Sequence, residues 1–328
     1  MRTLMLSLDN HILDPGSRVA ARMVEFGMQS ELDIIIPATQ NKEVSLSESV
    51  RVFGTGGSKW QQFFRLMRIS KDLQKKNSYD LITTQDPFLL GLVGLLSKKK
   101  DTKLEIQLHG DFFSTEYYRH SGLKNWIYYW LARFVLPRAD SVRVVGERIK
   151  QSVLRLGISE DKIVVRPVVL EIPENIQPDL ELRKKYSDKR IFLVLGRLHT
   201  VKNIAWLIKR LAALPQKDWH LLIVGEGEEK KHLESLAKKL HLEDEITFWP
   251  WTKEPFVVLK TADCLLFPSL SEGYGLVPME AVALGCPVIM NDVGVAGYEL
   301  NGPLVTVIPV SRPSDWERAL ENQSKRTL

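Results

Sequence analysis

Cysteine is scarce in this sequence: the 328 residues include only Cys264 and Cys286, and both lie in apolar surroundings. Two such residues exclude a disulfide framework and favour a reducing compartment. Long apolar runs are missing too. The N-terminal apolar stretch is too short for a signal peptide, and no segment approaches the roughly 20 apolar residues of a spanning helix. We therefore expect a cytoplasmic protein without a transmembrane anchor.

Two signatures of bound cofactors are also missing. The sequence has no Asp-x-Asp motif for a metal-bound diphosphate and no lysine in a context typical of pyridoxal phosphate, so we expect no metal and no cofactor. The net charge is +5 and the pI about 9.0, which fits nucleic acid, anionic lipid or an anionic substrate. Because no nucleic-acid recognition module is visible, nucleic acid is not an expected partner.

The chain is long enough for two domains, with 44% hydrophobic and 26% charged residues. Strand and helix patterns alternate along it, which predicts an α/β fold. Pro167, Pro173 and Pro178 punctuate a stretch without periodicity. This stretch predicts a linker at about residues 168–182, between a domain over 1–170 and another over 183–328.

The most informative stretch, residues 261–292, reads as strand, loop, helix and strand. Cys264 to Phe267 is a short apolar run that suits a buried parallel strand. A loop with glycines and hydroxyl residues follows, in which the backbone can approach a ligand. Pro278 suits the first helical position, Gly285 ends the helix, and residues 288–290 form the next strand.

This unit contains two acids, Glu272 in the loop and Glu280 in the expected first helical turn. The start of a helix favours a phosphate, whereas a carboxylate beside it suits sugar hydroxyls. Two interpretations are open. One is a sugar-nucleotide site, and the other is an ordinary α/β edge whose glutamates are solvated and interact only with the helix dipole.

A second candidate group follows a buried strand at residues 191–195. The segment G-R-L-H-T-V-K-N holds Gly196, Arg197 and Lys202 beside a helix start at Ile204. Arg binds phosphate oxygens through two hydrogen bonds and Lys supplies a point charge, so the pair suits a diphosphate; the alternative is two exposed basic residues. Further on, Gly225 lies in a glycine turn, and Trp249 fits either base stacking or ordinary packing.

In the first half, predicted strands end in loops that can carry a site. The strands are expected at residues 3–8, 32–36, 80–84, 104–108, 141–145 and 163–166, with 43–52 a connection or edge segment and 53–58 a flexible loop. His109 follows the fourth of these strands, and ligands of open α/β sheets bind outside the carboxyl ends of strands. The alternative for His109 is a ring satisfied by local backbone.

Two helical segments are rich in aromatic and basic residues. Residues 60–76 place Trp60, Phe63, Phe64, Met67 and Leu73 on one side and basic residues elsewhere; residues 117–138 include Tyr117, Tyr118, Arg119, His120, Trp126 and Trp130. Either these helices pack into the domain with a solvated basic face, or they form an amphipathic surface that contacts an anionic membrane.

The segment S-L-S-E-G-Y-G-L-V-P-M-E-A-V-A-L-G-C-P-V-I, residues 269–289, resembles the signature of retaining glycosyltransferases of family 4. G-R-L-H-T-V-K-N, residues 196–203, and V-G-E-G, residues 224–227, are similar to further segments of that family. The chain departs from the family after Pro167, where P-V-V-L-E replaces the usual Pro-Asn-Gly-Val-Asp. The resemblance covers most of the chain and is most specific between about residues 191 and 299.

The resemblance implies the GT-B fold, two Rossmann-like domains facing across a cleft, with an N-terminal acceptor domain and a C-terminal nucleotide-sugar domain. It implies retaining, metal-independent transfer from a UDP- or GDP-sugar to a glycan or lipid-linked acceptor in envelope or polysaccharide synthesis, on the inner face of the cell membrane. Catalytic roles fall to Glu272, His109, Arg197 and Lys202. Donor contacts fall to Gly196, Arg197, Lys202, Gly225, Trp249, Glu272, Gly273, Tyr274, Gly275, Leu276 and Glu280, and Gly16 is a candidate contact from the first domain.

Rival functions stay open at this point. The nearest are an epimerase or a phosphorylase on the same fold, of which the phosphorylase is disfavoured by the missing cofactor lysine. From other functional classes, the alternatives are a non-catalytic sugar-nucleotide-binding protein and a basic nucleic-acid binder. Nucleotide affinity without hydrolysis or transfer distinguishes the silent binder, and steep salt dependence distinguishes the nucleic-acid binder.

Overall fold

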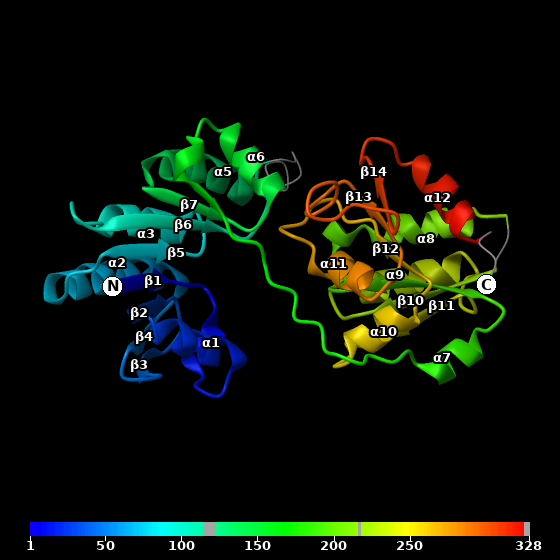
Figure 1. The fold of residues 1–328 in the computed structure, drawn as a ribbon, viewed down its shortest axis with the longest axis horizontal. Coiled ribbons are helices and arrows are strands. Elements are labelled where there is room, and N and C mark those ends of the chain that lie inside the picture. The colour runs from blue at the N-terminus through cyan, green and yellow to red at the C-terminus, as the bar shows by residue number, and fades with distance from the viewer. Residues whose placement is uncertain (114–121, 216–217, 325–328) are drawn as a thin grey trace. The chain divides into compact units, whose positions relative to one another are not determined.

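A computed structural model describes residues 1–113, 122–215 and 218–324 of the chain. The chain divides into two compact units, Met1–Pro167 and Val168–Leu328. Each is an α/β unit built on its own sheet (Figure 1). Across the described residues, no helix combines the length and the apolar character needed to cross a membrane.

The described part of the first unit holds an eight-stranded sheet in the order β3-β4-β2-β1-β5-β6-β7-β8. Its neighbouring strands pair in parallel, except that β3 is antiparallel to β4. The strands are β1 (Arg2–Leu6), β2 (Glu31–Ile36), β3 (Asn41–Ser45), β4 (Val50–Thr55), β5 (Leu81–Thr84), β6 (Lys103–Leu108), β7 (Ser141–Val144) and β8 (Ile163–Val165). The helices are α1 (Arg18–Gly27), α2 (Lys59–Lys76), α3 (Leu89–Ser97), α5 (Leu123–Val135) and α6 (Glu147–Leu154), with short 3-10 turns η1 (Asn10–Leu13), η2 (Leu136–Arg138) and η3 (Glu160–Lys162).

One region of the first unit differs from the sequence prediction. Residues 43–52 were expected to be a connection or edge segment and 53–58 a flexible loop. β3 is the edge strand of the sheet, whereas β4 extends through residues 50–55 into the expected loop. β3 is a polar edge strand, and its mostly exposed residues lack the apolar alternation that indicates a strand. The turn itself is confined to Gly56 and Gly57, both with positive φ.

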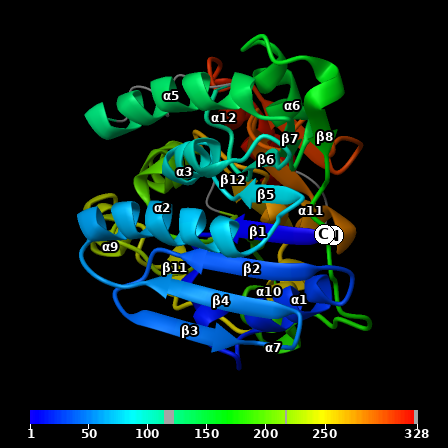
Figure 2. The same ribbon diagram turned by 90° about the vertical axis from the view of Figure 1, so that its left-hand side faces the viewer.

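Helices cover both faces of the first sheet. Helices α2, α3 and α5 lie side by side on one face (Figure 2), and α2 and α5 both contact α3. On the opposite face, α1 and η1 pack on β1, β2 and β4 around a buried apolar cluster that includes Ile12, Met23 and Ile34. The aromatic and basic residues from Tyr117 to His120, which the sequence singled out, lie outside the described residues.

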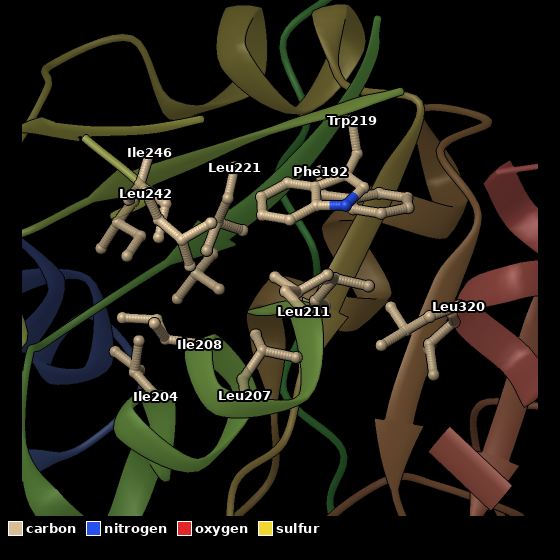
Figure 3. Close-up of a cluster of buried hydrophobic side chains, with 14 of the residues drawn as sticks. Phe192, Ile204, Leu207, Ile208, Leu211, Trp219, Leu221, Leu242, Ile246 and Leu320 are labelled. Carbon is tan, nitrogen blue, oxygen red and sulfur yellow. The ribbon is translucent and has the colours of Figure 1, made fainter. Parts of the chain in front are cut away.

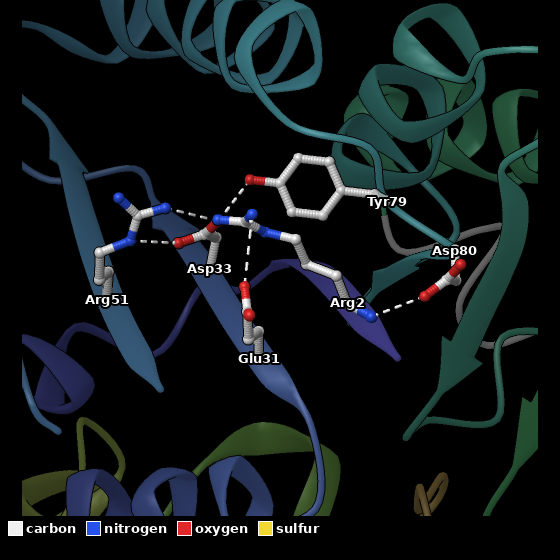
Figure 4. A network of polar contacts seen from close by, with 6 residues as sticks. All are labelled: Arg2, Glu31, Asp33, Arg51, Tyr79 and Asp80. Atoms are coloured by element: carbon white, nitrogen blue, oxygen red, sulfur yellow. Dashed lines mark hydrogen bonds and ion pairs between the residues drawn. The ribbon is translucent and has the colours of Figure 1, made fainter. Parts of the chain in front are cut away.

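A network of charged groups is buried near the amino ends of the central strands (Figure 4). Asp33 on β2, with only 3% of its side chain exposed, accepts two hydrogen bonds from Arg51, of 2.8 and 3.0 Å. It also accepts from Arg2 at 3.4 Å and from the hydroxyl of Tyr79. Burial, together with this hydrogen bond, raises the pKa of Tyr79, so the phenol stays protonated and donates.

The described part of the second unit holds a six-stranded, all-parallel sheet in the order β11-β10-β9-β12-β13-β14. Its strands are β9 (Arg190–Leu195), β10 (Trp219–Val224), β11 (Ile246–Trp249), β12 (Cys264–Phe267), β13 (Val288–Asn291) and β14 (Val305–Ile308). Its helices are α7 (Leu180–Lys185), α8 (Ile204–Ala212), α9 (Lys230–Lys239), α10 (Pro255–Thr261), α11 (Leu276–Ala283) and α12 (Asp315–Ser324), with a 3-10 turn η4 (Thr200–Lys202). The predicted strands at 191–195 and 264–267 are confirmed.

The core of the second unit fixes helix α8 against the sheet (Figure 3). Ile204, Leu207, Ile208 and Leu211 follow helical spacing, are almost fully buried, and belong to one apolar cluster with Phe192 of β9 and Leu320 of α12. Burial of each such side chain stabilises the fold by about 1.5–3 kcal/mol. Because α8 begins directly after Asn203, this packing also holds the segment 196–203 in place.

Helix α7 was not foreseen, and it starts inside the predicted linker. Asp179 caps it by accepting from the Leu182 amide at 2.9 Å, and the Asp179 amide donates to Thr261 at 2.7 Å. Arg183 binds Asp263 through two hydrogen bonds of 2.5 and 2.6 Å. Residues 179–185 are therefore fastened to α10 and to the start of β12 within the second unit.

Candidate functional site

The candidate site lies where the strand order of the second sheet reverses. From β9 the chain continues to β10 and β11 on one side, and later to β12, β13 and β14 on the other. Open α/β sheets bind ligands at such a switch point, outside the carboxyl ends of the strands. The two flanking loops are residues 196–203 after β9 and 268–275 after β12, which contain most of the predicted donor residues.

Glycines let the backbones at this edge come close together. Gly225, with φ 153°, lies against Gly196, and a Cβ on Gly225 would come within 1.9 Å of the Gly196 carbonyl oxygen. The Gly196 amide donates to Val224 and the Gly225 amide donates to Trp249, both at 3.0 Å. Gly196 itself, with φ 144°, has open space where a Cβ would stand. Its backbone is thus accessible at the mouth of the switch point.

The two loops are joined by an ion pair. Lys202 Nζ lies 2.6 Å from Glu272 Oε1, and both side chains are largely buried, with 23% and 14% exposed. The Leu270 amide also donates to the Val201 carbonyl at 2.9 Å. The structure therefore brings together the predicted cation of one loop and the predicted acid of the other.

Arg197 differs from Lys202 in its surroundings. Its side chain is exposed, and among the described residues its guanidinium has no acidic partner. Both cations line the hollow between β9 and β12, together with Gly196, Phe267, Pro268 and Ser269. One cation is therefore available at this hollow, and the other is held by a carboxylate that a ligand must share or displace.

Helix α11 starts earlier than predicted. It begins at Leu276 after Gly275, which adopts the left-handed conformation at φ 103°. Pro278 is consequently the third helical residue rather than the first, and Glu280 is the fifth, in the second turn rather than the first. The left-handed conformation of Gly275, which apolar residue patterns do not reveal, sets this start. Glu280 is half-buried, and loss of hydration raises its pKa.

The loop after β13 is hydrogen-bonded to the loop after β12 and packs closely against it. The Val295 amide donates to the Tyr274 carbonyl at 2.7 Å, and a Cβ on Gly294 would come within 2.2 Å of that same oxygen. The ring of Tyr274 is buried, which raises its pKa, with a further contribution from Glu299. Gly273, which is partly exposed, precedes this tyrosine, and Leu276, which is 39% exposed, begins α11 two residues after it.

Asn291 is a supporting residue that the sequence did not reveal. Buried at the end of β13, it donates to the carbonyls of Pro268 at 2.8 Å and Ser269 at 3.1 Å, and it accepts from the indole of Trp316 at 2.8 Å. Trp316, on α12, also packs edge-on against Trp206 of α8. The last described helix therefore holds the loop after β12 through a chain of buried hydrogen bonds, between residues too far apart in sequence to form a motif.

Trp249 is the last residue of β11 and is partly buried. Its carbonyl accepts from the Gly225 amide, which places it at the same sheet edge as the glycine turn after β10. Trp251, two residues on, is 57% exposed. Both readings of Trp249, stacking and packing, are compatible with this position.

His109 and Gly16 belong to the first unit. His109 reaches the surface after β6, and its Nε2 lies 3.1 Å from Gln107 Oε1. Loss of hydration, and secondarily the charge of Arg143, lower the pKa of His109, which favours a neutral ring at pH 7. At Gly16 an added Cβ would meet only Asp14, at 3.5 Å. The local backbone of the first unit therefore does not require a glycine there.

Asp86 is a buried acid of the first unit, just before helix α3. Its carboxylate accepts from the amides of Phe88 at 2.7 Å and Leu90 at 3.3 Å, at the start of α3. Burial raises its pKa to about 6, although the two amide hydrogen bonds oppose the shift. This geometry accounts for Asp86 as the cap of α3.

Two Rossmann-like units, one with a switch point suited to binding phosphate, are characteristic of the GT-B class of proteins. Comparison with known families agrees with this assignment. Residues 18–168 match the profile described as Glycosyltransferase Family 4, and residues 177–322 match the profile described as Glycosyl transferases group 1. The chain belongs to this glycosyltransferase family. The resemblance found in the sequence is thereby confirmed.

Curated relatives carry glycosyltransferase names. An uncharacterized glycosyltransferase of Haemophilus influenzae is 35% identical over 119 residues, which are 36% of this chain and 33% of that protein. The O-antigen chain mannosyltransferase RfbU of Salmonella typhimurium is 26% identical over 209 residues, 63% of this chain and 57% of that protein. The chain thus spans less than two thirds of the length of these curated relatives.

Solved structures share the fold along nearly the whole chain. The lipopolysaccharide outer core galactosyltransferase WaaB has a TM-score of 0.72 at 16% identity, with 99% of this chain and 90% of that chain covered. A sucrose-phosphate synthase from Thermosynechococcus elongatus has a TM-score of 0.75 at 21% identity, with 98% and 89% covered. Anabaena HepE in complex with UDP has a TM-score of 0.70 at 17% identity, with 99% and 91% covered. The α/β class and the GT-B architecture are therefore confirmed.

Proposed function

We propose that this protein is a retaining glycosyltransferase that moves a sugar from a nucleoside diphosphate to an acceptor hydroxyl. The observation that carries the proposal is the group at the switch point: Arg197, the Lys202–Glu272 pair, and the accessible backbone of Gly196. Two cations and one carboxylate at one sheet edge suit a ligand that is anionic at one end and rich in hydroxyls at the other.

In the proposed reaction, the bond between the anomeric carbon and the leaving phosphate oxygen breaks as the acceptor oxygen bonds to that carbon on the same face. The acceptor proton passes to an oxygen of the leaving diphosphate. Negative charge grows on that diphosphate, and Arg197, Lys202 and the start of α11 stabilise it, which is the kind of term that is usually largest in catalysis. Because these groups supply the positive charge, we propose that no metal is needed.

In this proposal, the two glutamates bind different parts of the donor. Glu272 binds hydroxyls of the transferred sugar, and His109, from the first unit, binds the same sugar as a neutral ring. Glu280 binds the ribose hydroxyls, with Gly225 and Trp249 beside the nucleoside. Gly273, Tyr274, Gly275 and Leu276 present backbone to the diphosphate, and Gly16 is the proposed contact from the first unit.

The donor we propose is a UDP- or GDP-sugar, with no additional cofactor, and the acceptor is a glycan or a lipid-linked glycan. The names of relatives and neighbours support this choice: one neighbour was solved with UDP, and RfbU is named for O-antigen chains. For a lipid-linked acceptor we place the enzyme in the cytoplasm, at the inner face of the cell membrane. An epimerase and a silent sugar-nucleotide binder are the alternatives that the experiment below separates.

A screen of UDP- and GDP-sugars for slow donor hydrolysis tests the proposed function. We expect one donor to release its nucleoside diphosphate, with the sugar first appearing in the anomeric configuration of the donor, and the same rate in excess chelator. Release of an epimerised sugar nucleotide would identify an epimerase. Affinity without any release would identify a silent binder, and activity lost in chelator and restored by metal would refute metal independence.

Exchanging each glutamate for glutamine tests the division of the donor between them. Glu280→Gln is expected to weaken binding of the bare nucleoside diphosphate roughly tenfold or more, because a charged acceptor for the ribose is lost. Glu272→Gln is expected to damage turnover without weakening that binding, because its proposed partner is the transferred sugar, which the bare nucleoside diphosphate lacks. Calorimetry measures both affinities. Glu234→Gln, on the exposed side of α9, is the matched control, and equal losses in both site variants would refute the division.

A further inference from the structure

Helix α5 presents its largest apolar side chains to solvent. Leu123 is 75% exposed, and Trp126, Ile127, Trp130 and Phe134 are each close to half exposed. Their spacing of three and four residues places them on one side of the helix. The inner side is held by smaller residues, Ala132 and Val135, which are fully buried. A helix that only packed into the domain would bury its tryptophans and expose its small residues.

The same layer of helices continues this surface. On α2, Trp60 is 82% and Phe64 66% exposed, and on the neighbouring α3, Leu96 is 54% exposed. The three helices lie side by side on one face of the first sheet (Figure 2). We call this surface, made of Trp60, Phe64, Leu96 and the exposed side of α5, the outer face. Several large exposed apolar side chains on one layer of helices indicate a site of interaction.

Basic residues border the outer face. Along α2 the line of Trp60 and Phe64 continues with Arg68, Lys71 and Lys75, all exposed. On α5, which contains no acidic residue, Arg133 lies over the ring of Trp130 at 5.5 Å. Arg138, just beyond α5, lies over Phe134 at 3.9 Å. Cationic and aromatic side chains are thus interleaved on the outer face. The acidic residue within this part of α2 is Asp72.

We propose that the outer face docks on the surface of an anionic lipid bilayer, with α5 lying in the plane of the interface. Tryptophan and phenylalanine on one side of a helix with flanking lysine and arginine are the composition of interfacial helices. A second copy of the chain, docked by the same face, would bring like charges together around the two-fold axis, which disfavours it. The proposal deepens the proposed function by naming the surface that reaches a lipid-linked acceptor, but it does not depend on transfer activity.

Cosedimentation of the 328-residue chain with vesicles tests the docking. Vesicles of equal parts phosphatidylcholine and phosphatidylglycerol are expected to bind the protein at low salt, binding is expected to fall as salt is added, and pure phosphatidylcholine is expected to bind far less. Changing Arg68, Lys71 and Lys75 together to serine is expected to weaken binding about a hundredfold, from on the order of 1 kcal/mol for each basic residue. Arg65 is left in place because its guanidinium lies 3.4 Å from the Thr55 carbonyl.

Matched control variants distinguish binding through the outer face from a general effect of removing charged or apolar side chains elsewhere on the protein. Changing Lys231, Lys238 and Lys239, exposed on α9 of the second unit, removes the same charge and is expected to leave binding nearly unchanged. The double change Trp126→Ser and Trp130→Ser is expected to weaken binding, whereas Phe26→Ser with Met28→Ser, exposed at the end of α1, is not. Equal losses in the paired sets would overturn the assignment to the outer face.

Three further outcomes would overturn the proposal. These are no binding to anionic vesicles at low salt, equal binding to neutral vesicles at all salt concentrations, and a dimer in solution that dissociates when Trp126 and Trp130 are changed. Donor hydrolysis without vesicles is measured on the same variants and is expected to stay at the level of the unmodified chain. Loss of hydrolysis in every protein preparation would instead count against the proposed function, so the two failures are distinguishable.

Discussion

Replacing Arg197 or Lys202 by alanine is expected to lower kcat/KM by about 30- to 1000-fold, which corresponds to roughly 2–4 kcal/mol of lost transition-state stabilisation. Both cations line the hollow at the switch point, where the leaving diphosphate would gain charge. Arg197 gives the simpler result, because its exposed guanidinium has no acidic partner among the described residues. Removing Lys202 also leaves the carboxylate of Glu272 without the 2.6 Å contact that it makes in this structure.

Steady-state donor hydrolysis measures the effect of both changes, and thermal unfolding shows whether each variant stays folded. Arg318→Ala on α12 and Lys231→Ala on α9 remove the same kinds of charge from exposed positions of the same unit. They are expected to keep normal turnover. Near-normal turnover of the Arg197 and Lys202 variants would mean that other groups bind the diphosphate.

Replacing Asp33 by alanine is expected to destabilise the first unit by about 3–5 kcal/mol, the usual cost of removing one partner from a buried ion pair. The carboxylate is nearly inaccessible, and its loss would leave the guanidinium of Arg51 and the hydroxyl of Tyr79 without their shared acceptor. Calorimetry is the suitable measurement, because a chain of two units need not unfold in one transition. The transition of the first unit should move to lower temperature while that of the second unit stays.

Asp72→Ala provides the control for that experiment. Asp72 also faces two cations, Arg68 and Lys75, but at 3.7 Å and on an exposed part of α2. Exposed pairs of this kind contribute roughly 0–1 kcal/mol, so the change should be small. A similar loss in both variants would show that burial is not what makes the Asp33 network matter.

Sequence patterns predicted helix α2 but left open whether its apolar side packs into the domain or forms a surface. Trp60 and Phe64 are exposed, whereas Leu66, Ser70 and Gln74 face inward. Gln74 is buried because its amide donates to the Ser97 carbonyl of α3 at 2.8 Å. Helical periodicity shows that a face exists, but a polar residue with a partner from another helix can be the buried one.

The candidate site shows a similar limit. Arg197, Lys202 and Glu272 could be selected from the sequence because each lies in a short motif at the end of a strand. Asn291 and Trp316 could not, because their roles rest on hydrogen bonds between residues more than twenty positions apart: Asn291 donates to backbone carbonyls, and Trp316 donates to the Asn291 side chain. The start of α11 was also misplaced, since it depends on the conformation of Gly275 rather than on the preference of Pro278 for a first turn.

The two thiols of the chain have a practical consequence. Cys264 and Cys286 are both buried and form no disulfide, and burial raises the pKa of Cys286 to about 12. Thiol-directed dyes react with accessible thiolates, so the native protein should take up little label while it stays folded. A single cysteine introduced on the exposed side of α5 would therefore carry an environment-sensitive fluorophore without first removing the natural ones, and it would report contact with lipid directly.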